Sequence, residues 1–216
     1  MRKMKVLVAC EFSGIVRDAF TSRGVDAWSC DLLPTERPGN HIQGDVVEVL
    51  GHGWDLMIAH PPCTYLTNAG VRHFHEHVTS RKGNRAKVFG EARFKEMRKA
   101  AEFFNLLKEA PVEHIAVENP IPHGWARELI GRYSQKIQPW MFGHGDVKAT
   151  CLWLKNLPPL RPTGFVKGRR PHVNSEVPSP DRWKNRSRTY VGIAEAMADQ
   201  WLEVTDFSDV FMNGFF

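Results

Sequence analysis

Residues 5–24 read KVLVACEFSGIVRDAFTSRG, and this stretch decides the fold. The apolar run over residues 5–10 has the length and composition of a buried strand. A turn at Glu11 to Gly14 follows, and apolar residues then recur at helical spacing until Gly24. A glycine in such a turn permits close approach of a ligand, and a helix start offers free backbone amides. The chain therefore opens in the manner of a nucleotide-binding α/β fold.

The remainder of the chain repeats this alternation of strands and helices. Further strands are predicted at residues 25–31, just before Gly44, at 54–59 and at 114–117, with more apolar stretches at 137–142 and 150–154. Helices are predicted around residues 94–104, near 125–130 and from 193 to 204. Continuous apolar strands separated by helices are typical of a parallel sheet. The sequence predicts an α/β fold with a doubly wound, mostly parallel sheet.

Length and composition fit one globular unit. The chain has 216 residues, of which 42% are hydrophobic, enough for a sizeable core. We expect a single domain over residues 1–216, with a mobile loop at 64–90 and a short basic insertion at about 155–188. No apolar run approaches the length of a membrane span, and no signal-peptide pattern precedes the first strand, so we expect a cytoplasmic protein. The four cysteines lack C-x-x-C spacing, which disfavours disulfides and structural zinc.

Positive charge is concentrated in two stretches. Residues 72–99 and 161–188 together hold seventeen Arg or Lys and five Asp or Glu, a net charge of +12, so the rest of the chain carries −7 of the total of +5. Such runs are more often solvated loops than binding sites. Both stretches, however, flank the predicted ends of strands, where they could face a phosphate backbone. A polyanionic partner is therefore plausible.

Acidic residues close the second and third predicted strands. Asp31 and Asp45 lie where ligands bind in open α/β sheets, beyond the carboxyl ends of the strands. One carboxylate there can accept ribose hydroxyls, and the other can accept from an adenine amino group. The alternative is that both are solvated loop acids. Their positions favour an adenosine-type ligand.

A thiol and a carboxylate follow two further strands. Cys63 comes after Pro61 and Pro62 at the end of one apolar run, and Glu118 ends another. A lone cysteine is often only a buried apolar residue, and a strand-end acid is often unremarkable. At a predicted cleft, however, the pair suits a nucleophile and a group that handles protons.

Short motifs occur in a fixed order along the chain: Phe12-Ser13-Gly14, Asp31, Gly44-Asp45-Val46, Pro62-Cys63 and Glu118-Asn119-Pro120. In this order they resemble the DNA cytosine-5 methyltransferases, including small phage-type members. The resemblance extends from about Phe12 to Trp201, with a closing motif at residues 188–196. It implies the Rossmann-like fold of methyltransferases that use S-adenosylmethionine as cofactor, a DNA partner, and a bacterial or phage-infected host cytoplasm. Protection of DNA from restriction would be the biological role.

The resemblance also implies roles for individual residues. Cys63 would attack carbon six of a flipped cytosine, and Glu118 would contact the base ring nitrogen. Asn119 would support the turn that begins at Glu118. S-adenosylmethionine would be held by these residues: Glu11, Phe12, Ser13, Gly14, Asp31, Leu32, Asp45, Val46, Pro61 and Glu195. DNA would be held by these basic residues: Arg81, Lys82, Arg85, Lys87, Arg169, Arg170, Lys184 and Arg186.

The chain departs from the family pattern at three places. Residues 142–150 carry Lys148 and Thr150 where the family has the two arginines of Gln-x-Arg-x-Arg, so Lys148 would replace one arginine in charge but not in bidentate geometry. Few residues between 154 and 188 are left for a base-specific DNA reader. The sequence His60-Pro61-Pro62-Cys63 also echoes the Pro-Pro-aromatic motif of amino methyltransferases, although a cysteine in the aromatic position favours carbon methylation.

Two other interpretations remain open. The chain could be a DNA-binding protein of this fold without catalysis. It could also be a methyltransferase that acts on RNA, on a free nucleotide or on an exocyclic amine. His73, His75 and His77 alternate in a basic loop without a carboxylate or cysteine partner, so we predict no metal site.

Overall fold

The computed structural model describes residues 3–75, 88–171, 177, 179 and 181–212. Its centre is a seven-stranded sheet with the strand order β3-β2-β1-β4-β5-β7-β6. The strands are β1 (Lys5–Ala9), β2 (Asp26–Asp31), β3 (His41–Gln43), β4 (Leu56–Ala59), β5 (His114–Pro120), β6 (Gln135–Ile137) and β7 (Thr150–Lys155). The first five run parallel, whereas β7 is antiparallel to both β5 and β6.

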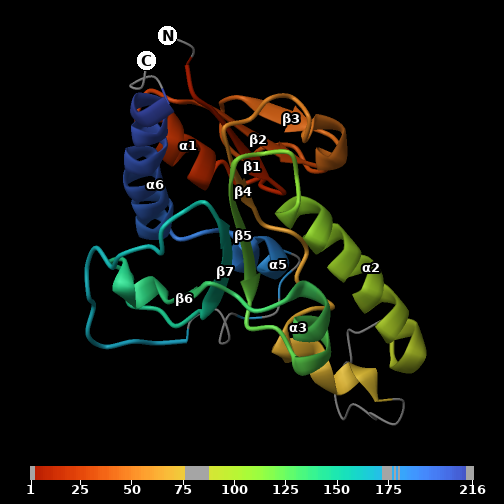
Figure 1. Ribbon diagram of the computed structural model, residues 1–216. Helices are drawn as coiled ribbons and strands as arrows, with labels where there is room; N and C mark the ends of the chain where they lie inside the picture. Colours follow the sequence, from red (N-terminus) through yellow and green to blue (C-terminus); the bar gives the residue numbers. More distant parts are fainter. Residues whose placement is uncertain (1–2, 76–87, 172–176, 178, 180, 213–216) are drawn as a thin grey trace.

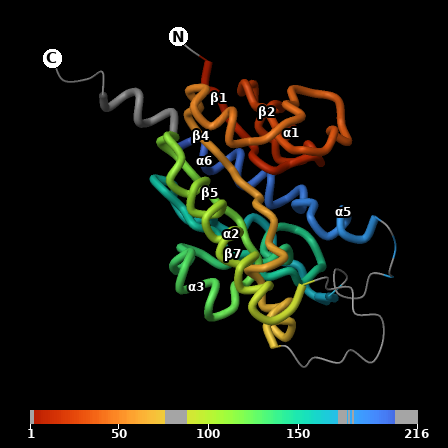
Figure 2. The backbone as a smooth tube through the Cα atoms, turned by 90° about the vertical axis from the view of Figure 1, so that its right-hand side faces the viewer, coloured from red at the N-terminus to blue at the C-terminus, as the bar shows by residue number. Residues whose placement is uncertain are grey.

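Helices cover both faces of this sheet. The α-helices are α1 (Ile15–Thr21), α2 (Gly90–Lys108), α3 (Gly124–Ile130), α5 (Arg182–Ser187) and α6 (Val191–Met212). Short 3-10 helices are η1 (Val46–Val49), η2 (Asn68–Phe74) and η3 (Pro139–Met141). Figure 1 shows α1 and α6 on one side of the sheet and α2 with α3 on the other. Figure 2, turned by 90°, shows α2 and α3 lying in front of the strands.

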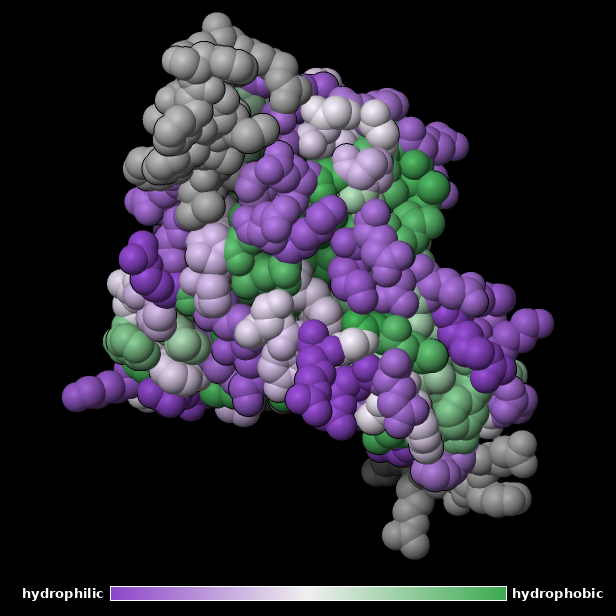
Figure 3. Space-filling model, viewed as in Figure 1, coloured by the Kyte–Doolittle hydropathy of each residue, from purple (hydrophilic) through white to green (hydrophobic). Residues whose placement is uncertain are grey.

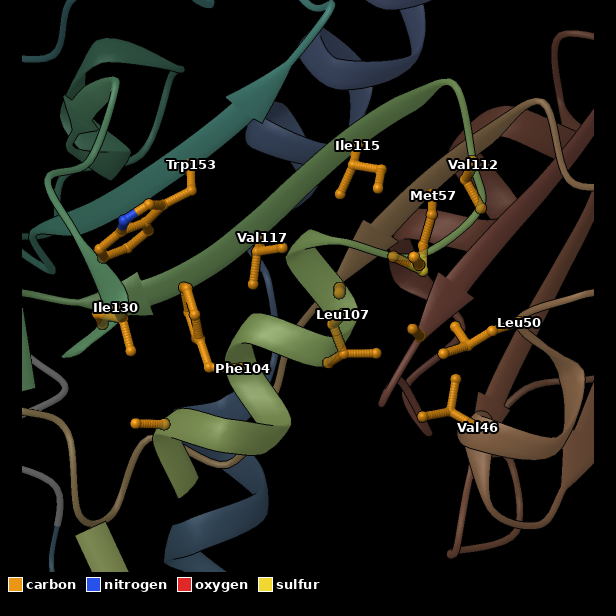
Figure 4. Packing of buried hydrophobic residues seen from close by; sticks show 14 of the residues in the cluster. Val46, Leu50, Met57, Phe104, Leu107, Val112, Ile115, Val117, Ile130 and Trp153 are labelled. Atoms are coloured by element: carbon orange, nitrogen blue, oxygen red, sulfur yellow. The ribbon is translucent and has the colours of Figure 1, made fainter. Parts of the chain in front are cut away.

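The alternation of side chains along β1 divides the core in two. Val6 and Val8 point to the α1 and α6 side, where Trp201 is fully buried. Leu7 and Ala9 point to the α2 side, where Phe104 and Trp153 pack edge to face. Figure 4 shows this second cluster, with the side chains of α2 directed at β5 and β7. Both faces of the sheet are therefore buried, as is usual for a parallel sheet.

The predicted fold class is confirmed: the protein has a Rossmann-like, doubly wound and mostly parallel sheet. The predicted elements recur within a few residues. Strand β5 continues through Glu118, where a turn was expected, because it pairs with β7 along its whole length. Residues 68–74 form η2 packed on α2, so this described part of the expected mobile loop is ordered structure. Helix α5 lies inside the segment that we expected to be a short basic insertion.

The outer surface is polar, as expected for a helix-covered sheet. Figure 3 shows hydrophilic residues over much of the face seen in Figure 1, with hydrophobic residues showing between them. Within the described part of the chain, no helix is both long and apolar enough to cross a membrane.

Candidate active site

The register of the sheet aligns four polar side chains at its carboxyl edge. Ala9 is paired with Cys30 of β2 and with Ala59 of β4, and Ala59 is paired with Val117 of β5. The residues that follow these positions are Asp31, Cys10, His60 and Glu118. Because parallel strands end at the same edge, these four neighbours form a row across the centre of the sheet.

The turn from β1 into α1 is closed by its own side chains. The Glu11 carboxylate accepts hydrogen bonds from the backbone amides of Val16, at 2.8 Å, and Arg17, at 3.2 Å. Ser13 donates its hydroxyl to Glu11 at 3.0 Å and accepts from the amide of Ile15 at 3.3 Å. The expectation of free amides at this helix start is wrong, because Glu11 and Ser13 occupy them. Glu11 and Ser13 therefore stabilise the turn, and the amides that they bind are not offered to an anion.

Gly14 and Arg17 join this turn to the loop after β2. Gly14 has a φ of +71°, a left-handed conformation that favours glycine, and a methyl group there would collide with the Arg17 side chain. The fully buried Arg17 guanidinium donates to the carbonyls of Arg37 and Pro38 and pairs with Asp18 at 2.7 Å. The β2–β3 loop is thereby held beside the predicted cofactor turn.

Asp31 and Asp45 both face the thiol of Cys10. Burial, followed by the charges of Asp31, Cys30 and Asp45, raises the pKa of Cys10 far above its ordinary value. Burial also raises the pKa of Asp31, although its carboxylate accepts the amide of Leu33 at 2.9 Å. Asp45 begins η1 by accepting from Val47 at 3.0 Å. The two predicted adenosine-binding carboxylates are therefore brought together.

Two predicted apolar neighbours of these carboxylates differ in exposure. Leu32 follows Asp31 and is 73% exposed, whereas Val46 follows Asp45 and is buried. An exposed leucine beside a half-buried carboxylate offers an apolar surface for a flat ring. Pro61, in the neighbouring turn after β4, is buried.

Cys63 and Glu118 lie in one site. Burial and the Glu118 charge raise the pKa of the Cys63 thiol, while Lys148 and Arg186 act in the opposite direction. Three elements thus meet at this thiol: the turn after β4, the end of β5, and the basic residues of the β6–β7 connection and α5. The thiol is half-buried and predominantly protonated in the free protein.

Glu118 is held by His60, a residue whose part in the site the sequence did not reveal. His60 Nδ1 lies 3.3 Å from the Glu118 carboxylate, and their side chains are 9% and 19% exposed. Burial of Glu118 opposes ionisation, but the hydrogen bond and charge of His60, together with Lys148, hold the pKa of Glu118 below its ordinary value. The strand register was the available signal, since it sets residues 60 and 118 side by side.

Lys148 acts on α5 as well as on the site. Its Nζ donates to the carbonyls of Arg186 at 2.7 Å and Arg188 at 3.3 Å, at the carboxyl end of α5. A cation stabilises the helix terminus there. The same ammonium influences both Cys63 and Glu118. Lys148 therefore ties α5, with Arg186, to the thiol and carboxylate.

A cavity of about 280 Å³ opens beside the first residue of α1. Its lining residues are Ile15, His144, Lys148, Asn185, Arg188, Thr189, Tyr190 and Val191. Arg188 forms a two-bond ion pair with Glu36, at 2.6 and 2.8 Å, which lowers the pKa of Glu36. Phe12 packs against Trp183 of α5, with ring centroids 6.0 Å apart. These contacts bring the closing motif, α5 and the first turn together around the cavity.

Gly192 is essential to the wall of this cavity. A methyl group at this position would overlap the carbonyl oxygen of Phe142. We expect Gly192→Ala to lower the free energy of unfolding by about 1–3 kcal/mol, the usual cost of overpacking. Gly124→Ala, at the start of α3, has open space and should change stability by less than about 1 kcal/mol. Urea unfolding of both variants measures the difference, and equal stabilities would contradict this account of the wall.

Several predicted residues lie elsewhere. Glu195 is exposed and its carbonyl accepts from Arg23 after α1, away from Asp31 and Asp45. Arg169 stacks on Trp140 at 3.6 Å, and exposed Arg170 pairs by its backbone with residues of the β6–β7 connection. Lys184 lies 5.7 Å from the Trp183 ring centroid. Arg81, Lys82, Arg85 and Lys87 lie outside the described residues.

Asn119 is fully buried beside Glu118. Its side-chain amide donates to the carbonyl of Pro120 at 2.5 Å, within strand β5 rather than in the turn that we expected there. Its Oδ1 finds no hydrogen-bond partner among the residues that the structure describes. Across the described ranges, no three His, Cys, Asp or Glu side chains gather as a metal site.

Comparisons with known proteins give likenesses in structure only. No family model and no curated protein matches the sequence. One similar solved structure is described as a DNA modification methyltransferase encoded within an E. coli prophage: identity is 14%, the TM-score is 0.42, and 70% of this chain matches 46% of that chain. Another is the Entamoeba histolytica methyltransferase EhMeth, with 10% identity, a TM-score of 0.44, and 83% of this chain matching 61% of that one. At these values the likenesses carry no information about substrate.

Proposed function

We propose that the protein is a DNA cytosine-5 methyltransferase that uses S-adenosylmethionine. The observation that carries this proposal is the meeting of Cys63 and Glu118 beyond the ends of the neighbouring strands β4 and β5, where the charge of Glu118 acts on the Cys63 thiol. A nucleophilic thiol beside a carboxylate is the pair that cytosine methylation at carbon five requires, since that carbon is a poor nucleophile until carbon six is attacked.

The chain's own residues supply the steps at the base. The Cys63 thiolate forms a bond to carbon six, and the electron pair of the carbon five–carbon six double bond becomes available at carbon five. The proton of the Cys63 thiol passes by way of the Glu118 carboxylate to the ring nitrogen, and Glu118 then accepts a hydrogen bond from that protonated nitrogen and stabilises the adduct. After methylation, a water molecule takes the proton from carbon five, which restores the double bond and expels the thiolate. Lys148 and Arg186 favour the thiolate that begins and ends this sequence.

The residues present fit S-adenosylmethionine. Asp31 and Asp45 provide two carboxylates at adjoining strand ends, Leu32 provides an apolar surface, and the cavity beside Ile15 lies at the same edge of the sheet. When bound, the cofactor supplies an electrophilic methyl group. Glu11, Ser13 and Gly14 would act by fixing the turn along which it lies.

His60 supports recognition of a polar base. Its Nε2 atom is buried and lacks a hydrogen-bond partner in the described part of the chain. A buried nitrogen without a partner costs free energy, so a polar group of a bound substrate is its natural complement. His60 would thus orient Glu118 through Nδ1 and meet the substrate through Nε2.

DNA is the proposed partner because Lys148 and Arg186 act on the Cys63 thiol and Arg188 lines the neighbouring cavity. The target base must leave the stack to reach Cys63. We expect DNA affinity to fall steeply with salt. Lys184→Ala should reduce the slope of log K against log salt concentration by about 1 if Lys184 contacts a phosphate. Lys155→Ala is the matched control, because Lys155 lies on β7 toward the opposite edge of the sheet. A flat salt dependence in the wild-type protein would exclude this use of the basic residues.

Transfer of a tritiated methyl group tests the function. The protein is incubated with labelled S-adenosylmethionine and, separately, with mixed-sequence duplex DNA, single-stranded DNA and RNA, and each product is digested to nucleosides. Labelled 5-methyldeoxycytidine from DNA supports the proposal. Label on an exocyclic amine or in RNA would assign the other substrate classes instead.

A DNA-binding protein without methyl transfer is the second candidate. The Lys148 Nζ donates to two carbonyls at the end of α5, so this ammonium has a structural role as well as its influence on Cys63 and Glu118. Cofactor binding and salt-sensitive DNA binding without any labelled nucleoside would favour this candidate.

A further inference from the structure

The turn that carries Cys63 is held by a buried arginine from α2. Arg93 is 4% exposed, and its guanidinium donates to the carbonyl of Thr64 at 3.0 Å and to that of Val88 at 3.4 Å. Thr64 directly follows Cys63. One side chain therefore binds the residue after the thiol and a residue 24 positions further along the chain.

The same guanidinium is packed between aromatic rings. It lies 4.9 Å from the Tyr65 ring centroid and 5.1 Å from that of Phe74 in η2. A methyl group at Gly70 would overlap the guanidinium, so the glycine leaves the room that Arg93 occupies. Planar stacking and two carbonyl bonds are together specific to arginine.

A histidine before α3 holds the same turn. His123 is 1% exposed; its Nε2 donates to the carbonyl of Tyr65 at 2.9 Å, and its backbone amide donates to that of Leu66 at 3.1 Å. Its Nδ1 accepts the amide of Ala126 at 3.2 Å at the start of α3. These bonds require the neutral ring with the proton on Nε2.

Four consecutive carbonyls after β4 are thus bound. The carbonyl of Cys63 itself accepts the amides of Leu66 and Thr67, each at 3.1 Å. Those of Thr64, Tyr65 and Leu66 are bound by Arg93 and His123. A turn with all its carbonyls engaged has little freedom to move its first side chain.

We propose that Arg93 and His123 are positioning residues that fix the turn of Cys63 and so aim its thiol at the substrate. The inference deepens the proposed function and rests on it for the role of the thiol, although the rigidity of the turn can be measured without any reaction. A nucleophile displaced by about 1 Å can lose about 10²-fold in rate.

The test compares three variants with the wild-type protein. Arg93→Lys keeps the charge but loses the fork and the stacking surface. His123→Asn keeps a good helix cap but is too short to reach Tyr65. Arg98→Lys is the matched control, because Arg98 lies on the same helix and pairs with exposed Glu91 at its surface. The measurements are hydrogen exchange at the amides of residues 66 and 67, the rate of Cys63 alkylation by iodoacetamide read by peptide mass spectrometry, and methyl-transfer kinetics.

We expect Arg93→Lys to speed exchange at residues 66 and 67 at least about tenfold while the amides of β1 stay protected, as local opening predicts. His123→Asn should act in the same direction. The rate of Cys63 alkylation should change in both variants, and kcat should fall about 10–100-fold with little change in KM for S-adenosylmethionine.

Exchange and alkylation in Arg93→Lys and His123→Asn that match the Arg98→Lys control would overturn the proposal. Exchange that rises equally in β1 would also overturn it, since that result shows only a loss of stability. If the wild-type protein transfers no methyl group, the proposed function fails, and exchange and alkylation still decide whether the turn is held as described.

Discussion

Cys63→Ala is expected to lower methyl transfer to DNA by at least about 10³-fold, because carbon five of cytosine stays unreactive without thiol addition at carbon six. Binding of cofactor and of DNA should persist, since the substitution leaves Asp31, Asp45 and the basic residues of α5 in place. Initial rates with labelled cofactor and equilibrium binding, both measured on one preparation, separate these two effects.

The matched control for this variant is Cys151→Ala. Cys151 is a fully buried thiol on β7, opposite Asn119 in the sheet register. Its loss should cost some stability, as any small core cavity does, but leave methyl transfer within a few-fold of the wild-type rate. Equal losses of activity in both variants would show that the effect of Cys63→Ala arises from packing rather than from chemistry.

Glu118→Gln should lower methyl transfer by about 10²–10³-fold, the usual range for a lost proton-handling group. It should also change the thiol. Burial and then Glu118 raise the pKa of Cys63 because a nearby negative charge disfavours the thiolate. Removing that charge therefore shifts the pH profile of Cys63 alkylation to lower pH. Lys148→Met should shift it to higher pH, because Lys148 favours the thiolate.

The control for the pH profile is Glu113→Gln. Glu113 is exposed at the opposite end of β5, next to its first residue. Its removal should leave both the alkylation profile and the rate of methyl transfer unchanged. An unshifted profile in Glu118→Gln would contradict the placement of this carboxylate beside the thiol.

The sequence predicted the sheet well because the strands are continuous apolar runs that are bounded by glycine, proline or acidic residues. The residues that end these runs could also be placed together, since parallel strands share one carboxyl edge. Cys63 and Glu118 were found in this way, because β4 and β5 are neighbours and Cys63 lies in the turn that follows β4.

The rest depends on contacts between distant segments, which periodicity does not record. The role of His60, which precedes two prolines, was not predicted, because its position beside Glu118 depends on the register between β4 and β5. The occupied amides of α1 follow from the rotamer of Glu11, and the docking of α5 follows from Lys148 and from the Glu36–Arg188 ion pair. Only the folded chain brings these partners together.

Trapping of a covalent complex tests the central claim most directly. Duplex DNA containing 5-fluorocytosine is incubated with the protein and S-adenosylmethionine, because fluorine at carbon five cannot leave as the proton does and the thiol adduct should persist. The account predicts a complex that survives denaturing electrophoresis. Peptide mass spectrometry should show the DNA attached at Cys63, and the Cys63→Ala variant should form no such complex. Methylation of ordinary cytosine at carbon five without any trapped complex, or a complex attached to another residue, would contradict it.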